Sequence, residues 1–333
     1  MERLAQVQTW LQQVISGQSF DLAPASSDAS FRRYFRVSLA HRTLIVMDAP
    51  PQHENCAPFV HVAQLFGAAG VHVPEILAQD LAQGFLLLSD LGSDTYLSQL
   101  KADSPGTADA LYRDANAALI KIQLASKPDQ LPPYDAALLM REMRLFPEWY
   151  LAKHLQVQLT PSQTAVLENA LQLILNMVLA QPSVYVHRDY HARNLMVSEP
   201  NPGVLDFQDA VYGPITYDLA SLYKDAYIAW DEEQILDWTV RYWEAAKRAR
   251  LPVAEDFGAF YRDFEWMGIQ RHIKVLGIFA RLYHRDGKDG YLKDMPLVLH
   301  YLRSACERYR ALGPLLDLLD ELHDREQQVG YTF

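Results

Sequence analysis

Residues 187–194 read HRDYHARN, and residues 205–207 read LDF. Each stretch follows a short apolar run that predicts a β-strand, so Asp189 and Asn194 share one loop and Asp206 ends the next strand. Phosphoryl transfer from a nucleotide needs a carboxylate beside the attacking hydroxyl and oxygen ligands that hold a metal against the phosphates. The spacing fits a catalytic base at Asp189 and metal ligands at Asn194 and Asp206. An isolated HRD is more often a salt-bridged or helix-capping turn, but here the loop, its flanking strands and the second aspartate occur in order.

The rest of the chain divides into two patterns. We expect β-strands over residues 32–38, 43–48, 74–79 and 84–90, with a helix over 59–67 between the second and third of them. After Gly92 the apolar spacing becomes helical, apart from a β-rich patch over residues 184–206. The expected helices span residues 107–126, 135–158, 161–181, 217–229, 232–249, 255–285 and 295–323.

These patterns predict an α+β protein of two lobes. The small β-rich N-lobe, residues 1–91, would bind the nucleotide with its sheet and helix. The large, mainly helical C-lobe, residues 92–333, would carry the catalytic loop, the metal site and the acceptor pocket.

Composition excludes several classes of protein. The 333 residues carry a formal net charge of -11, so a nucleic-acid partner is not expected, because phosphate backbones require concentrated Lys and Arg. Cys56 and Cys306 are far apart and indicate neither a disulfide framework nor a zinc site. The N-terminal MERLAQVQTWLQQVISG predicts an amphipathic helix, not a signal peptide, and no apolar run is long enough to cross a membrane. We therefore expect a cytoplasmic protein with no membrane contact and no obligate protein partner.

The catalytic loop also resembles that of a known family. HRDYHARN, LDF and the later YDLA (residues 217–220) are similar to the H-x-D-x-H-x-x-N loop, the strand-end Asp and the YDLA of the aminoglycoside phosphotransferase and choline kinase superfamily. The resemblance spans nearly the whole chain and implies the protein-kinase-like fold, with ATP as co-substrate and Mg²⁺ as cofactor. It implies Asp189 as the base, with Asn194 and Asp206 as metal ligands. It also implies that Asp218 is a buried structural acid bonded to the catalytic loop.

Three further segments narrow this resemblance. They are PASSDASFRRYFRV (24–37), IVMDAPP (45–51) and GIQRHIKVLGIFARLYHRDGK (268–288). They are similar to segments of the bacterial kinases that phosphorylate the anomeric C1 hydroxyl of N-acetylmuramic acid and N-acetylglucosamine in peptidoglycan recycling. The resemblance implies a small-molecule amino sugar as acceptor.

The expected nucleotide site departs from the usual kinase pattern at two places. The turn SSDASF (residues 26–31) contains no glycine, so backbone N–H groups and hydroxyls of small residues would approach the phosphates. The third strand, TLIVMD, lacks the lysine that normally contacts the phosphates, and Met47 or Asp48 stands in its place. We expect Arg32 or Arg33 to supply the cation instead. With the hinge after the last strand of the lobe, the predicted nucleotide contacts are Ser27, Ser30, Phe31, Arg32, Arg33, Ser89, Asp90 and Leu91.

The expected acceptor residues lie on the helix over residues 255–285 and beside the catalytic loop. An apolar stripe through Ile269 and Ile273 runs next to a polar stripe through Gln270 and Lys274, and this pattern is compatible with either a solvated face or a sugar-binding face. The lactyl carboxylate of N-acetylmuramic acid needs a cation, and Arg271 is favoured because a guanidinium can form two parallel bonds to a carboxylate. The predicted substrate contacts are His191, Arg193, Asp225, Gln270, Arg271 and Lys274.

Two other functions are compatible with the sequence. The acids between Asp206 and Asp237 could receive a cationic aminoglycoside or amino alcohol as the acceptor. The missing lysine would fit a catalytically inactive, nucleotide-binding pseudokinase, although the presence of Asp189, Asn194 and Asp206 argues against inactivity.

Overall fold

The computed structural model describes residues 2–15, 17–27, 31–100 and 105–329. The chain divides into two compact units. Unit 1 contains the residues up to Ser98 together with Arg193–Asp209, and unit 2 contains Gln99–Ala192 together with the residues from Ala210 onward. The segment that carries Asn194 and Asp206 therefore belongs to the same unit as the N-terminal sheet.

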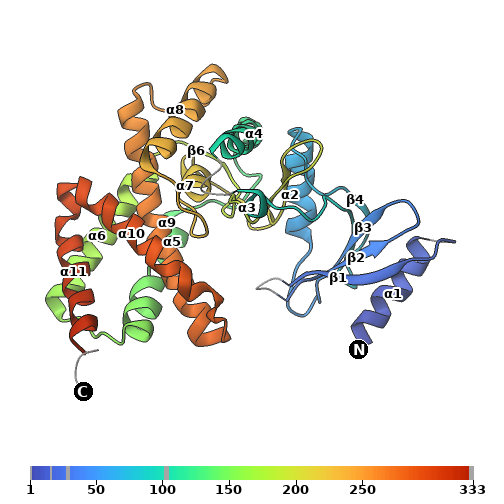
Figure 1. Cartoon of the computed structure of the whole chain (residues 1–333), viewed down its shortest axis with the longest axis horizontal. Coiled ribbons are helices and arrows are strands. Elements are labelled where there is room, and N and C mark those ends of the chain that lie inside the picture. The colour runs from blue at the N-terminus through green and yellow to red at the C-terminus, as the bar shows by residue number, and fades with distance from the viewer. Residues whose placement is uncertain (1, 16, 28–30, 101–104, 330–333) are drawn as a thin grey trace. The chain divides into compact units, whose positions relative to one another are not determined.

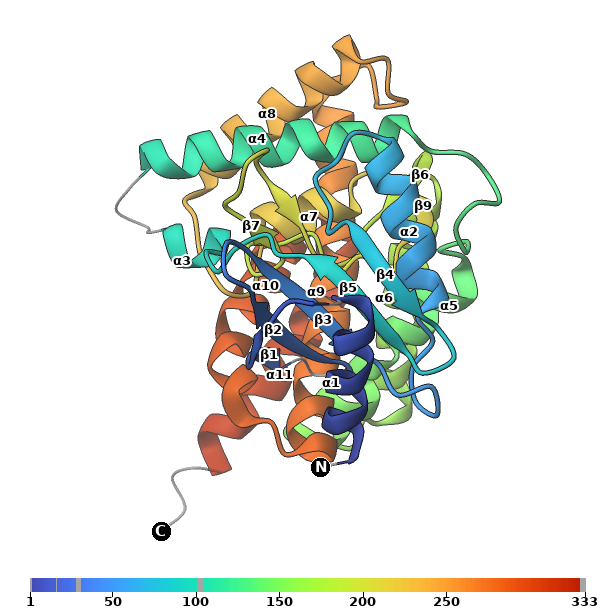
Figure 2. The same ribbon diagram turned by 90° about the vertical axis from the view of Figure 1, so that its right-hand side faces the viewer.

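Unit 1 is built on a five-stranded antiparallel sheet with the strand order β1-β2-β3-β5-β4. Helices α1 and α2 lie on opposite sides of this sheet (Figure 1), and α1 lies in front of the strands in Figure 2. Strands β7 and β8 form a separate hairpin. The elements are α1 (Glu2–Val14), β1 (Asp21–Ser27), β2 (Arg33–Ser38), β3 (Thr43–Asp48), α2 (Ala57–Ala68), β4 (Ile76–Asp80), β5 (Phe85–Ser89), α3 (Tyr96–Gln99), β7 (Leu195–Met196) and β8 (Gly203–Val204).

Alternation along the strands gives the sheet two different faces, because successive side chains of a strand point to opposite sides. On one side, Val37 and Val46 pack in a cluster with Val7 and Leu11 of α1. On the other side, Arg36 and its cross-strand partner Ile45 line a cavity. The position of a residue in β2 or β3 therefore decides whether its side chain contacts α1 or the cavity.

Asp48 is a fully buried charge on the α1 side of the sheet. Its two carboxylate oxygens accept hydrogen bonds from Nε of Arg3 at 3.0 Å and from Nε of Arg33 at 3.1 Å. Arg3 also donates to the carbonyl oxygen of Gln83 at 2.8 Å. A carboxylate removed from water needs such partners, because its desolvation costs several kcal/mol. The two arginines thus attach α1 to the second and third strands.

Unit 2 is mainly helical, and its longest helix, α9, contacts α5, α6, α7, α8 and α10. Helices α6, α10 and α11 lie side by side (Figure 1), and β6 pairs with β9. None of the helices in the described ranges is both long and apolar enough to cross a membrane. The elements are α4 (Pro105–Leu124), α5 (Ala136–Met143), the π-helix η1 (Phe146–His154), α6 (Pro161–Leu179), β6 (Ser183–Val186), β9 (Val211–Pro214), α7 (Tyr217–Tyr223), α8 (Glu232–Arg248), α9 (Phe257–Asp286), the 3-10 helices η2 (Asp289–Asp294) and η3 (Arg310–Leu312), α10 (Met295–Arg308) and α11 (Gly313–Val329).

The predicted α+β fold class is confirmed. The helix expected over residues 217–229 ends earlier, at Tyr223, and three further differences lie at proline and glycine positions. Strand β1 was not expected, because Pro24 disfavours a strand and the structure accommodates it with a register shift. The single helix expected over residues 135–158 is two elements, since Pro147 begins the π-helix. The helix expected over residues 295–323 likewise divides, and α11 starts at Gly313.

We expect Asp48→Asn to lower the free energy of unfolding of unit 1 by about 3–5 kcal/mol, because removing one side of a buried ion pair leaves its partners uncompensated. Chemical denaturation would measure the loss, and hydrogen–deuterium exchange across β3 would assign it to this unit. Asp80→Asn is the control, since Asp80 bonds Gln83 within its own turn and surface substitutions usually change stability by about 0.5 kcal/mol or less. Equal losses in the two variants would contradict a structural role for the Asp48 pairs.

Candidate active site

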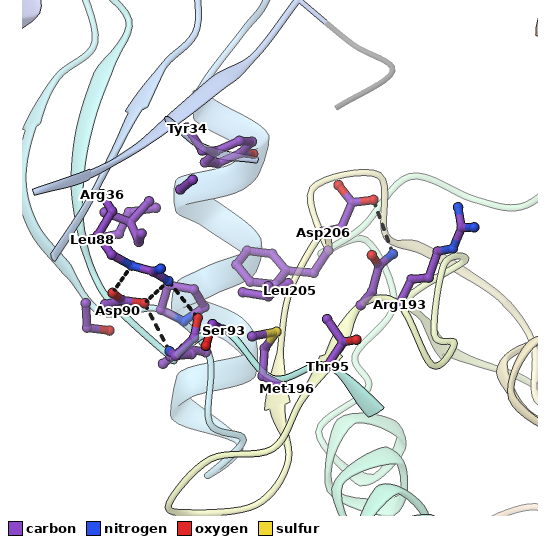
Figure 3. Close-up of a pocket in the computed structure, with 18 of the residues that line it drawn as sticks. Tyr34, Arg36, Leu88, Asp90, Ser93, Thr95, Arg193, Met196, Leu205 and Asp206 are labelled. Carbon is purple, nitrogen blue, oxygen red and sulfur yellow. Dashed lines mark hydrogen bonds and ion pairs between the residues drawn. The ribbon is translucent and has the colours of Figure 1, made fainter. Parts of the chain in front are cut away.

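A cavity of about 540 Å³ lies in unit 1, on the side of the sheet opposite α1. Figure 3 shows Tyr34 and Leu88 on the side of the sheet, and Asp206 with Arg193 on the side of the 193–209 segment. The walls between are largely apolar and the polar groups gather at the two ends, which is typical of small-molecule sites.

The segment after β5 forms one end of this cavity. Ser89, Asp90 and Leu91, the expected hinge residues, all line it. Arg36 donates to Asp90 Oδ2 at 2.7 Å and to the carbonyl oxygen of Gly92 at 2.9 Å (Figure 3). Burial alone would raise the pKa of Asp90, but the bonds from Arg36 and its neighbours hold that pKa below its usual value. The carboxylate of Asp90 is therefore occupied by Arg36.

Asn194 and Asp206 line the other end of the cavity. Asn194 Nδ2 donates to Asp206 Oδ2 at 3.3 Å, and Gln208 Nε2 donates to Asp206 Oδ1 at 2.8 Å. Asp206 adopts φ +62°, a left-handed conformation that is uncommon outside glycine and is concentrated at functional sites. Amide and carboxylate oxygens fit a hard divalent cation that takes its remaining ligands from phosphates and water. Within the described ranges, no three His, Cys, Asp or Glu side chains cluster as an all-protein metal site.

The register of β2 and β3 shows which residues replace the usual lysine. Met47 is the cross-strand partner of Tyr34, which lines the cavity, so Met47 takes the place of the lysine on the cavity side. Asp48 and its partner Arg33 are on the α1 side, where they bind each other. The expectation that Arg33 supplies the phosphate-binding cation is therefore wrong in its geometry. Arg32 precedes Arg33 in the sequence, and successive side chains of a strand point to opposite sides. Arg32 therefore remains the predicted cation.

The glycine-free turn before β2 is described in part. Ser30 lies outside the described residues, as does the side chain of Ser27, whose backbone ends β1. Phe31 is 62% exposed and stacks on His53 at a ring distance of 4.5 Å. Its backbone N–H donates to Glu54 Oε1 at 3.2 Å. The amide of Phe31, expected to approach a phosphate, is thus engaged by the loop before α2.

Asp218 holds the start of the catalytic loop in unit 2. Its carboxylate accepts the backbone N–H groups of His187 at 2.7 Å and of Arg188 at 3.0 Å. Burial raises the pKa of Asp218 to about 7, although these two bonds favour the charged form. The bond to the catalytic loop that the resemblance implied is present in the structure.

Two further bonds hold the part of the loop that follows Asp189. The hydroxyl of Tyr190 donates to the carbonyl oxygen of Ala115 on α4 at 2.8 Å. The N–H of Ala192 donates to Asp225 Oδ2 at 3.3 Å. The backbone that carries Asp189 is therefore fixed to two separate parts of unit 2.

The electrostatic surroundings favour an ionised Asp189. Burial alone would raise its pKa, but Lys274, His191 and Arg188 together lower that pKa below its usual value. An ionised carboxylate can accept a proton from a hydroxyl, which is what a general base requires.

A cluster of buried charged groups lies next to this loop. Glu142 of α5 accepts hydrogen bonds from the hydroxyl of Tyr134 and from Nη2 of Arg188, and lies 3.1 Å from Nζ of Lys274. Burial would raise the pKa of Glu142, but Lys274 and Arg188 hold it below its usual value. Lys274 also donates to the hydroxyl of Tyr217 at 2.9 Å.

The polar stripe of α9 is buried, so the alternative of a solvated face is wrong. Gln270, Arg271 and Lys274 are 0%, 5% and 7% exposed. Lys274 is bound to Glu142 and Tyr217, which argues against a direct contact with sugar. Within the described ranges, neither amide atom of Gln270 has a hydrogen-bond partner, and the same holds for Nη1 of Arg271.

Three other predicted substrate residues fall in different surroundings. Asp225 is fully buried, and its Oδ1 has no hydrogen-bond partner within the described ranges. The ring of His191 lies 5.6 Å from that of Tyr227. Arg193 lines the cavity of unit 1 beside Asn194.

Glu142 and Arg36 were missed by sequence reasoning. Glu142 lies 46 residues from Arg188 in the chain, and no motif around it signals the contact. For Arg36 a signal was present, since alternation from Arg32 would have placed it on the cavity side of the sheet.

Comparisons with known proteins agree with this geometry. Residues 21–255 match the model of the phosphotransferase enzyme family. The chain is 49% identical over 336 residues to the N-acetylmuramate/N-acetylglucosamine kinase of Neisseria meningitidis, with 100% of both chains covered. It is 54% identical over 302 residues to the kinase of the same name from Pseudomonas aeruginosa, covering 91% of this chain and 88% of that one.

A solved structure shows the same fold. The choline/ethanolamine kinase family protein of Mesorhizobium loti superposes with a TM-score of 0.66 at 14% identity, covering 95% of this chain and 98% of that one. The resemblance seen in the catalytic loop is thereby confirmed. The chain belongs to the phosphotransferase enzyme family.

Proposed function

We propose that this protein transfers the γ-phosphoryl group of ATP to the anomeric C1 hydroxyl of N-acetylmuramic acid and N-acetylglucosamine. The observation that carries the proposal is the 49% identity to a kinase of that name across the full length of both chains. Three features of the structure support the same chemistry. They are the polar groups at both ends of the cavity, the buried polar atoms without partners on Asp225, Gln270 and Arg271 within the described ranges, and the lowered pKa of Asp189.

ATP would occupy the cavity of unit 1. Its base would bond to the backbone of Ser89–Leu91, and its phosphates would extend towards Asn194 and Asp206. These two residues would hold Mg²⁺, which when bound neutralises phosphate charge and aligns the phosphates. Arg32 would supply the cation that the third strand lacks.

Asp189 would act as the general base. The C1 hydroxyl gives its proton to the Asp189 carboxylate and its oxygen bonds to the γ-phosphorus, while the bond from that phosphorus to the β,γ-bridging oxygen breaks and ADP leaves. Asp189 and Asn194 are five residues apart, so the chain limits their separation to about 17 Å. Phosphoryl transfer of this kind depends mostly on positioning and electrostatics.

The acceptor would be polar and would contact unit 2. A buried polar atom without a partner costs about 1–3 kcal/mol. Asp225, Gln270 and Arg271 each carry such an atom within the described ranges, and an amino sugar offers hydroxyl and amide groups that satisfy both donors and acceptors.

We further propose a cytoplasmic location and a role in peptidoglycan recycling. ATP is a cytoplasmic co-substrate, and Cys56 and Cys306 are both buried free thiols. The sugar 1-phosphate product would serve the formation of nucleotide sugars.

The test is phosphorylation of a panel of acceptors, followed by phosphorus NMR of the product. We expect Mg²⁺-dependent formation of sugar 1-phosphate from both amino sugars, and a fall of about 10²–10⁴-fold in kcat for Asp189→Asn, the usual worth of a general base. If only aminoglycosides or amino alcohols were phosphorylated, the acceptor would be of that class and not an amino sugar. Nucleotide binding without turnover on any acceptor would indicate a pseudokinase.

The two arginines before and in β2 should behave differently. We expect Arg32→Met to raise the KM for ATP or lower kcat by about 10- to 100-fold, since a charged hydrogen bond is worth about 1.5–3 kcal/mol. Arg33→Met should leave both constants near wild type and lower thermal stability instead, because Arg33 binds Asp48. A kinetic defect in Arg33→Met with near wild-type constants in Arg32→Met would show that Arg33 contacts the phosphates.

Arg271→Gln tests whether Arg271 binds the lactyl carboxylate of N-acetylmuramic acid. A chain with a net charge of -11 repels an anionic acceptor unless a local cation receives it. We expect kcat/KM to fall by about 10- to 100-fold for N-acetylmuramic acid, from about 1.5–3 kcal/mol of lost interaction, and to change little for N-acetylglucosamine. Arg262→Gln, an exposed charge on the same helix, is the control and should affect neither sugar. An equal loss on both sugars would show that Arg271 supports the shared ring or the fold.

A further inference from the structure

Glu142 is a buried carboxylate at the end of α5 that belongs to none of the motifs of the catalytic site. It is 7% exposed, and it binds Tyr134, Arg188 and Lys274 together. Its partners come from the segment before α5, from the catalytic loop and from α9. One side chain therefore joins the loop to two helices of unit 2.

Arg188 immediately precedes the proposed base and adopts φ +76°. A non-glycine residue in the left-handed region costs about 1–3 kcal/mol and persists only where its surroundings determine it. Here Asp218 takes the backbone N–H of Arg188, and Glu142 takes its guanidinium. Both the backbone and the side chain of the residue before Asp189 are thus held by buried carboxylates.

Lys274 extends the same contact into α7 and α9. Its Nζ lies 3.1 Å from Glu142 Oε1 and donates to the Tyr217 hydroxyl at 2.9 Å. Tyr217 is adjacent to Asp218 in sequence. Gly277, one turn after Lys274, lets α9 approach closely, since a Cβ there would lie 2.4 Å from the carbonyl carbon of Leu145. A larger residue would separate α9 from the segment that follows Glu142.

Arg188 and Lys274 are shared between Glu142 and Asp189. Both cations bind Glu142, and both lower the pKa of Asp189. Because Glu142 fixes where these cations lie, its geometry and the charge of Asp189 are linked through them.

We propose that Glu142 is a positioning residue, which holds the loop that carries Asp189 in its catalytic conformation by binding Arg188 and Lys274. This inference rests on the proposed function, because it takes Asp189 as the base. In this role Glu142 would act through Arg188 and Lys274, and not by contact with the nucleotide or the acceptor.

Glu142→Gln is the first test, since glutamine keeps the size and removes the charge. We expect kcat to fall by about 10- to 100-fold, as small misplacements of a reacting group can cost about 10²-fold, while the KM values for ATP and sugar change by less than about 3-fold. We also expect faster hydrogen–deuterium exchange in the peptide over residues 185–192, which reports on the loop without any turnover. Exchange therefore tests the inference even if no amino sugar is phosphorylated.

Glu265→Gln is a matched control in the same unit. Glu265 is 4% exposed and accepts hydrogen bonds from Arg308 at 2.7 Å and Tyr309 at 2.6 Å, with Lys224 at 3.9 Å. The surroundings of Glu265 are therefore similar to those of Glu142, but they lie away from the catalytic loop. We expect a comparable loss of thermal stability, with kcat and loop exchange unchanged. Equal effects of the two variants on kcat and exchange would overturn a specific role for Glu142.

A double-mutant cycle with Arg188→Met completes the experiment. If Glu142 acts through Arg188, the kcat of the double variant is no lower than that of the less active single variant, because both substitutions remove the same interaction. Additive losses would overturn that route, as would wild-type kcat and exchange in Glu142→Gln. Should Glu142→Gln fail to fold, Arg188→Met alone must show the same fall in kcat and the same faster exchange for the proposal to stand.

Discussion

A charge that leaves water has to find a partner, and this constraint organises both units of the protein. In unit 1, Asp48 binds arginines from α1 and β2 and so attaches the first helix to the sheet. In unit 2, Glu142 binds two cations beside the loop over residues 187–194, and Glu265 of α9 binds Arg308 at the end of α10. Each of these carboxylates joins segments that are distant in the chain. The buried charges thus act as connections between elements, in addition to the apolar core.

The two-residue period of a strand explains how neighbouring arginines come to have separate roles. Arg33 faces α1 and is used in the ion pair with Asp48, while Arg36 faces the cavity and fixes the hinge through Asp90. A shift of one residue in register would exchange the two sets. Of the arginines in RRYFR (residues 32–36), Arg33 is therefore structural and Arg36 lies at the cavity, and composition alone cannot distinguish the two.

The sequence predicted the local features well, because local features depend on neighbouring residues. The four strands from β2 to β5 and the helical remainder follow from apolar periodicity, and the order of Asp189, Asn194 and Asp206 indicates the family. The contacts of Glu142 could not be predicted, since its partners lie 46 and 132 residues away and only the packed fold brings them together. Strand β1 was missed for a different reason, as Pro24 is a poor strand residue that an edge position tolerates.

Two buried cations of helix α9 differ in whether the protein already pairs their charge. Arg271 and Lys274 are three residues apart and both are more than nine-tenths buried. On sequence both are candidates for the lactyl carboxylate, with Arg271 favoured for its guanidinium. Lys274 has its charge matched by Glu142 and a hydrogen bond to Tyr217. Arg271 instead has Nη1 without a hydrogen-bond partner within the described ranges. Because an unsatisfied buried donor is costly, a partner supplied by an acceptor stabilises Arg271 far more than Lys274. The state of pairing, which sequence does not reveal, therefore ranks the two cations.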